Sequence, residues 1–183
     1  MSQLVQLKQK RLSMKYFNGF SLSHEEIFFK EQLLSHDYCV AGFSYGAIEA
    51  FEYAYKSQER IDRLILLSPA FFQNHKKSFI RTQLRYYKLD KIAYTKQFLE
   101  NVVHPSSLSL SDYFVESNIE ELEKLLTYVW NKEKIIELLS RGIEIEVFMG
   151  EEDKIVNSVE SFNFFKELVT CYFYKDVGHL LYK

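Results

Sequence analysis

The chain has 183 residues, a formal net charge of −2, 47% hydrophobic residues and 26% charged residues. This composition is typical of a globular protein and excludes an intrinsically disordered chain, and the length predicts one domain over residues 1–183. The small net charge argues against a nucleic-acid or membrane partner, and no apolar run reaches the roughly 18 residues that span a bilayer.

The first residues and the cysteines indicate a cytoplasmic protein. Residues 1–13 are too polar for the apolar core of a secretion signal, and because they carry no motif we expect them to be dispensable for activity. Cys39 and Cys171 lie in apolar runs, so we expect buried, reduced thiols rather than a disulfide. Nothing in the sequence predicts the oligomeric state.

Short apolar runs alternate with segments of helical periodicity along the chain. In chain order they predict strand 14–18, helix 24–35, strand 38–43, helix 47–57, strand 62–67, helices 77–87, 91–103, 119–130 and 132–140, strand 143–149, helix 159–168 and strand 170–174. Ser23 and Glu26 match a capping box at the start of the first helix.

This order predicts an α/β fold of minimal size. Alternating strands and helices favour a mostly parallel sheet, here of about five strands, with helices on both faces. The all-helical segment 71–142 interrupts the alternation, and we interpret it as a lid inserted between two strands.

The segment Gly42-Phe43-Ser44-Tyr45-Gly46 matches the pattern G-x-S-x-G. It lies between a predicted buried strand and a predicted helix, which is the context that the motif requires. A tight turn there lifts the central hydroxyl clear of the sheet, and small flanking residues let strand and helix approach each other. The pattern therefore predicts Ser44 as the nucleophile of a serine hydrolase; an ordinary glycine-rich turn is the alternative.

A serine hydroxyl needs a general base, and in this architecture the chain order is Ser, acid, His. His179 is the last histidine of the chain and follows the last predicted strand. The loop 150–153 follows the penultimate strand, and we favour Asp153 as the acid because it lies where the loop turns toward the next helix. The other carboxylates that could serve are Glu151, Glu152 and Asp176.

Acyl transfer also needs hydrogen-bond donors for the developing oxyanion. The backbone N–H of Tyr45 follows the nucleophile and is one candidate. The second donor is expected in the loop after an early strand, where Asn18-Gly19-Phe20 stands. We therefore predict the N–H groups of Phe20 and Tyr45 as an oxyanion hole.

The first half of the predicted lid is strongly basic. Residues 73–96 contain seven Lys and Arg residues against one Asp. Arg81, Arg85 and Lys88 recur at helical spacing and share one face. A patch of one sign attracts an acidic partner, although a solvated helix face is the alternative.

Together, Asn18-Gly19-Phe20, the G-x-S-x-G segment, the loop 150–153 and Gly178-His179 resemble the α/β-hydrolase superfamily, over roughly residues 14–183. More closely, the short chain resembles the pimeloyl-acyl-carrier-protein methyl ester carboxylesterases of biotin synthesis. The resemblance implies a triad of Ser44, Asp153 and His179 and an acyl carrier protein that bears the substrate. On charge alone, the residues expected to receive that protein are Lys76, Lys77, Arg81, Arg85 and Lys88.

Two other functions remain open from the sequence. Another acyl ester hydrolase or a thioesterase would use the same residues, and a non-catalytic carrier-binding protein could keep the same fold. We expect no cofactor and no metal, because no pair of His or Cys stands at ligand spacing.

Overall fold

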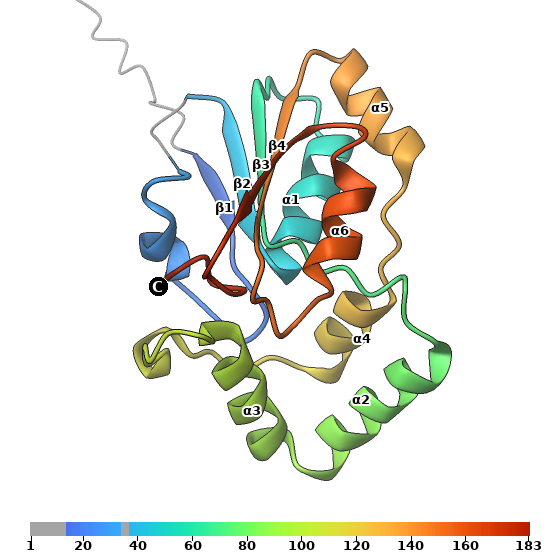
Figure 1. Cartoon of the computed structure of the whole chain (residues 1–183). Coiled ribbons are helices and arrows are strands. Elements are labelled where there is room, and N and C mark those ends of the chain that lie inside the picture. The colour runs from blue at the N-terminus through green and yellow to red at the C-terminus, as the bar shows by residue number, and fades with distance from the viewer. Residues whose placement is uncertain (1–13, 34–36) are drawn as a thin grey trace, which may run out of the picture.

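The computed structural model describes residues 14–33 and 37–183. The expectation for residues 1–13 and the end of the helix predicted at 24–35 lie outside these residues. Five strands form one parallel sheet in the order β1-β2-β3-β4-β5 (Figure 1). They are β1 (Lys15–Phe17), β2 (Cys39–Phe43), β3 (Arg63–Leu67), β4 (Glu144–Gly150) and β5 (Thr170–Tyr174). The predicted fold class is therefore confirmed.

Six α-helices accompany the sheet within the described residues, each close to a predicted segment. They are α1 (Tyr45–Lys56), α2 (Lys77–Leu89), α3 (Lys91–Val103), α4 (Ile119–Thr127), α5 (Lys132–Ser140) and α6 (Ser158–Phe165). None of the described helices is long and apolar enough to cross a bilayer.

The helix predicted over residues 24–35 is wrong in type and length within the described residues. The structure has a short 3₁₀ helix, η1 (Glu25–Phe29), and His24 before it has a left-handed φ of 62° with no capping hydrogen bond from its side chain. The predicted capping box does not form: Ser23 Oγ contacts Tyr113 O at 3.5 Å instead. The burial of Glu25 determines the local structure instead, because its side chain is fully buried and this part of the chain therefore turns toward the interior.

The two faces of the sheet are covered differently. Helices α1, α5 and α6 lie on one face of the sheet, whereas η1 lies on the opposite side, beside the carboxyl-terminal segment (Figure 1). Phe29 of η1 packs on Phe43 of β2, with ring centroids 4.9 Å apart. Every residue of β2 is buried as a result.

Within the insertion 71–142, helices α2, α3 and α4 lie beyond the carboxyl ends of the strands (Figure 1). We call residues 76–127 the lid, because α5, the last helix of the insertion, lies on a face of the sheet instead. Trp130 joins the two ends of this insertion, because its indole N–H donates to Ala70 O at 2.9 Å and its backbone N–H to Gln73 Oε1 at 2.7 Å. The lid is thus tied to the body of the protein at its base.

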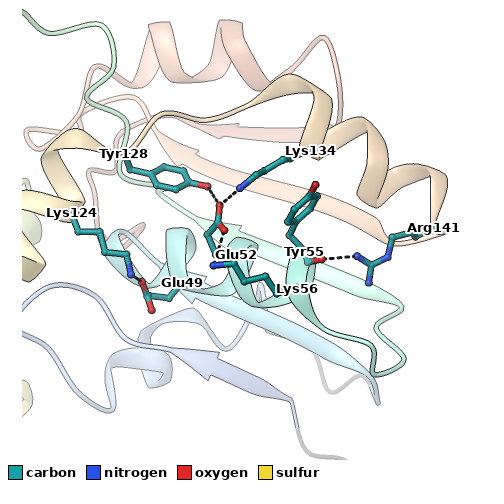
Figure 2. Close-up of polar contacts among 8 residues, drawn as sticks. All are labelled: Glu49, Glu52, Tyr55, Lys56, Lys124, Tyr128, Lys134 and Arg141. Atoms are coloured by element: carbon teal, nitrogen blue, oxygen red, sulfur yellow. Dashed lines mark hydrogen bonds and ion pairs between the residues drawn. The ribbon is translucent and has the colours of Figure 1, made fainter.

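Polar side chains bind α1 to α4 and α5 (Figure 2). At their centre, Glu52 Oε1 accepts hydrogen bonds from Lys134 Nζ and Tyr128 Oη, each at 2.7 Å, and Lys56 Nζ lies 3.2 Å from Oε2. Partial burial favours the neutral acid, but these donors outweigh it and lower the pKa of Glu52 below its ordinary value of 4.5. A second ion pair joins Glu49 to Lys124.

Replacing Glu52 with Gln should lower the free energy of unfolding near neutral pH by about 1–3 kcal/mol, since charge-assisted hydrogen bonds are lost. The pKa of Glu52 is lower in the folded protein than in the unfolded chain. The stabilisation is therefore present above the unfolded pKa and is lost as the pH falls through the folded pKa. Urea unfolding across pH should show the two proteins converging in acid.

Glu49→Gln is the matched control. Its carboxylate and Lys124 are more exposed, so the expected loss is only about 0.2–1 kcal/mol. A difference between wild type and Glu52→Gln that stays constant from neutral to acidic pH would contradict the assignment.

Candidate active site

Ser44 stands at a sharp turn between β2 and α1, with φ 54° and ψ −111°. This conformation is rare for a residue with a side chain. Two glycines allow it: a Cβ on Gly42 would lie 2.1 Å from Gly46 O, and one on Gly46 would lie 2.0 Å from Phe17 O. The strand and the helix therefore approach as closely as the sequence pattern predicts.

The Ser44 hydroxyl and one nitrogen of His179 are buried without partners. Ser44 is 1% exposed and His179 is 0% exposed. Within the part of the chain that the structure describes, neither Ser44 Oγ nor His179 Nε2 has a hydrogen-bond partner, so the two are not bonded to each other. The ring of His179 lies 5.0 Å from the ring of Phe43, the residue before Ser44.

Asp153 is the carboxylate that the structure brings to His179. Its Oδ2 lies 2.6 Å from His179 Nδ1, and its Oδ1 accepts from the N–H groups of Ile155 and Val156 at 2.7 and 3.0 Å. An imidazole that donates its Nδ1 proton to a carboxylate presents the electron pair of Nε2 on the opposite side of the ring. The other candidates, Glu151, Glu152 and Asp176, are exposed.

The loops that carry Asp153 and His179 touch through glycines. A Cβ on Gly150 would lie 2.3 Å from Gly178 O, and one on Gly178 would lie 1.8 Å from His104 O. Ser68, which sequence reasoning did not single out, donates from Oγ to His179 O at 2.6 Å. Its position directly after β3 was the only indication in the sequence, since the residues of the site lie at the carboxyl ends of the strands.

The backbone N–H of Phe20 differs from its neighbours in the same loop. Among the described residues it has no acceptor, and the same holds for the N–H of Tyr45. The neighbouring amides of the loop all donate: Gly19 to Glu25, Ser21 to Ser117, Leu22 to Gly19, Ser23 to Tyr113 and His24 to Asn18. The two amides predicted as an oxyanion hole are thus free to donate.

The lid packs on this loop. The ring of Phe20 lies 5.3 Å from Phe98 of α3 and 6.4 Å from Tyr87 of α2. Tyr87 Oη donates to Ser117 O at 2.7 Å, and Ser117 Oγ in turn accepts from Ser21 N–H. Because Ser44 and His179 are buried, a substrate can reach the hydroxyl only if some of the covering residues move.

Sequence reasoning missed Glu25 next to this site. Its side chain is fully buried, and Oε1 accepts from Gly19 N–H at 2.7 Å and from Tyr16 Oη at 3.2 Å. Burial raises the pKa of Glu25, and the hydrogen bonds from Gly19 and Tyr16 only partly offset it. Its position within a polar run, beside Glu26, gave no signal of burial.

Among the described residues, the basic residues of the lid make no contact with the predicted triad residues Ser44, Asp153 and His179. All of them are exposed and, within the described ranges, have no ion-pair partner: Lys76, Lys77, Arg81, Arg85 and Lys88. Exposed apolar side chains stand beside them, with Leu89 70% and Ile92 83% exposed.

Candidate metal ligands are not gathered anywhere in the described chain: no group of three His, Cys, Asp or Glu side chains is arranged to hold an ion. Cys39 and Cys171 are free thiols. Burial raises the pKa of each to about 11, which keeps both protonated near neutral pH.

The parallel sheet, the turn at Ser44 and the helical lid define an α/β-hydrolase fold. No family model matches the chain, and no curated protein sequence does. Solved structures do: carboxylesterase CesB (YbfK) from Bacillus subtilis is 12% identical, with 94% of this chain and 79% of that chain covered and a TM-score of 0.63. At this identity the likeness establishes the fold.

Two further structures have the same fold. A hydrolase from Oleispira antarctica, olei00960, is 14% identical, with 92% of this chain and 84% of that chain covered and a TM-score of 0.68. BioG from Haemophilus influenzae is 12% identical, with 91% of this chain and 88% of that chain covered and a TM-score of 0.57.

Replacing Gly178 with Ala should destabilise the protein by about 3 kcal/mol or more, because the new methyl group would overlap a backbone carbonyl that cannot swing away. Gly142→Ala is the control: nothing lies within 4 Å of its Cβ, but its φ is +81°. That change should cost roughly 1–2 kcal/mol from backbone conformation alone. Equal losses in chemical denaturation would show that the contact with His104 is not tight.

Proposed function

We propose that this protein is a serine carboxylesterase with Ser44, His179 and Asp153 as its triad. The observation that carries the proposal is the pair of buried, unpartnered atoms, Ser44 Oγ and His179 Nε2, with Asp153 hydrogen-bonded to the far side of the imidazole. A buried polar atom without a partner is costly, and such atoms gather where a substrate supplies what is missing.

The chemistry follows from these positions. Ser44 Oγ attacks the ester carbonyl carbon while His179 Nε2 takes its proton, and Asp153 stabilises the resulting imidazolium. The carbonyl oxygen becomes an oxyanion that accepts hydrogen bonds from the N–H groups of Phe20 and Tyr45. His179 then gives its proton to the departing alcohol, which leaves an acyl-enzyme. Water, deprotonated by His179, cleaves that ester and releases the carboxylic acid.

For the substrate we propose the methyl ester of pimeloyl-acyl-carrier protein. The products are methanol and the carrier protein that bears the free pimeloyl carboxylate. The sequence resemblance supports this choice, and so does the lid. Its five basic side chains, which have no ion-pair partner among the described residues, and the exposed Leu89 and Ile92 suit an acidic protein that also offers apolar surface.

The first test is Ser44→Ala. Hydrolysis of the carrier-bound methyl ester, followed by mass spectrometry of the carrier, should fall by several orders of magnitude, because triad members act as a unit. Thermal unfolding should change little, since the hydroxyl makes no hydrogen bond. A fluorophosphonate probe should label the wild type and leave the variant unlabelled.

Three outcomes would count against the proposal in different ways. Retained activity in Ser44→Ala would remove Ser44 as the nucleophile. Cleavage of the thioester in place of the methyl ester would make the protein a thioesterase. Carrier binding with neither hydrolysis nor labelling of the wild type would make it a non-catalytic binding protein.

The lid gives a second test. Changing Arg81, Arg85 and Lys88 together to Glu should raise KM for the carrier-bound ester and leave hydrolysis of a small free ester unchanged. Single exposed charge pairs contribute only about 0.2–1 kcal/mol, so the three are changed together. Added salt should weaken the wild type on the carrier substrate, because the Debye length falls to about 3 Å at 1 M.

The matched control reverses three exposed basic residues away from α2 that have no ion-pair partner within the described chain: Lys30, Lys166 and Lys183. This variant should behave as the wild type on both substrates. If the α2 variant loses both activities equally, its residues support the fold rather than docking, and if it loses neither, they form only a solvated helix face.

A further inference from the structure

The loop that carries Phe20 is held by a buried acid. Glu25 is 0% exposed, and its Oε1 receives the Gly19 N–H at 2.7 Å, a short hydrogen bond for a backbone donor. Tyr16 Oη lies 3.2 Å from the same oxygen. Within the described chain, Oε2 has no partner. Burying a carboxyl group costs free energy, so the position of Glu25 calls for a role beyond the local structure of η1.

The hydrogen bonds around Phe20 fix the direction of its N–H. The carbonyl of Gly19 accepts from Leu22 N–H at 3.1 Å. Because a peptide group is planar and trans, its N–H points away from its C=O, so the Phe20 N–H points away from Leu22. Ser117 Oγ anchors the following amide of Ser21 at 2.8 Å.

The peptide before Gly19 is the remaining point at which the loop could turn. Glycine has no Cβ and rotates more freely than any other residue, so Gly19 needs an external anchor. A larger residue cannot supply one, because a Cβ on Gly19 would lie 2.7 Å from the ring of Phe43. Glu25 supplies the anchor from a different segment of the chain.

We propose that Glu25 is a positioning residue, which holds the Gly19 amide so that the Phe20 N–H is aimed at the oxyanion. The inference rests on the proposed hydrolase function, because it assigns Phe20 to the oxyanion hole. Glu25 does not touch the substrate and acts only through the loop. The anchor requires an acceptor at Oε1 and does not require a charge.

The surroundings of the carboxyl are consistent with this role. Burial raises the pKa of Glu25, and the nearby Glu26 adds to the effect. The titratable groups that face the carboxyl are Tyr16 on β1 and Glu26 beside it. Gln is a close mimic, because it keeps an acceptor oxygen in the place of Oε1.

The experiment compares Glu25→Ala, Glu25→Met and Glu25→Gln on a small free ester. Ala and Met both remove the acceptor oxygen. Met also keeps most of the side-chain volume, so the Met variant tests the proposal if the Ala variant does not fold. Both should lower kcat by about 10²–10³-fold, the effect of losing one oxyanion donor, with KM close to wild type. Gln should restore most of kcat.

A second readout separates positioning from general support of the fold. A trifluoromethyl ketone forms a tetrahedral adduct with Ser44 and needs the oxyanion hole, whereas the product carboxylate does not. Glu25→Met should bind the ketone more weakly by about the factor lost in kcat, and bind the product as the wild type does. Equal losses for both ligands, or a Met variant with wild-type kcat, would overturn the proposal.

Glu26→Ala is the matched control, because this neighbouring side chain is 37% exposed and lies 4.0 Å from His24. It should leave kcat and ketone binding unchanged. The Ser44→Ala variant keeps this test distinct from that of the hydrolase function. If the wild type hydrolyses esters through Ser44 while Glu25→Met does so equally well, only the role of Glu25 fails.

Discussion

The contact between the start of α1 and the ends of β1 and β2 is the constraint on which the site depends. A Cβ on Gly46 would lie 2.0 Å from Phe17 O and 2.5 Å from Asn18 O. With the helix this close to the strands, the turn at Ser44 cannot relax, and strain of the order of 1–3 kcal/mol is held in its backbone. The same contact brings the loop after Phe17 alongside the turn, so one packing contact positions both the proposed nucleophile, Ser44, and the two candidate oxyanion amides.

Sequence patterns predicted the sheet well because each strand is short, apolar and followed by a clear turn. The bounds of α3 and α5 match the predicted ranges. Chain order pointed to His179 and to the loop 150–153, and the turn of that loop toward the next helix favoured Asp153. The failure came between β1 and β2, where Ser23 and Glu26 matched a capping box. Local pattern could not show that Glu25, one residue earlier, is drawn into the interior by an amide six residues away. Burial of an acid depends on tertiary contacts, and a single sequence does not contain them.

Two acids of this protein show how surroundings decide the role of the same side chain. Glu52 is partly buried but receives hydrogen bonds from a lysine and a tyrosine, and its pKa falls. Glu25 is fully buried against a backbone amide and a phenol, and its pKa rises. The first holds a helix in place through charge, whereas the second holds a loop through an acceptor oxygen alone. Composition treats the two residues as equivalent, although their contributions to stability change in opposite directions with pH.

Trp130 is the only tryptophan in the chain, and it lies where the lid joins the body. It is 2% exposed and packs on Phe51 of α1 and Phe165 of α6, with ring centroids 5.2 and 5.1 Å apart. All indole fluorescence therefore originates from this one junction, where the ring is shielded from water and its N–H is engaged. The intrinsic fluorescence of Trp130 therefore reports whether the junction between the lid and the body stays packed while the outer helices of the lid move.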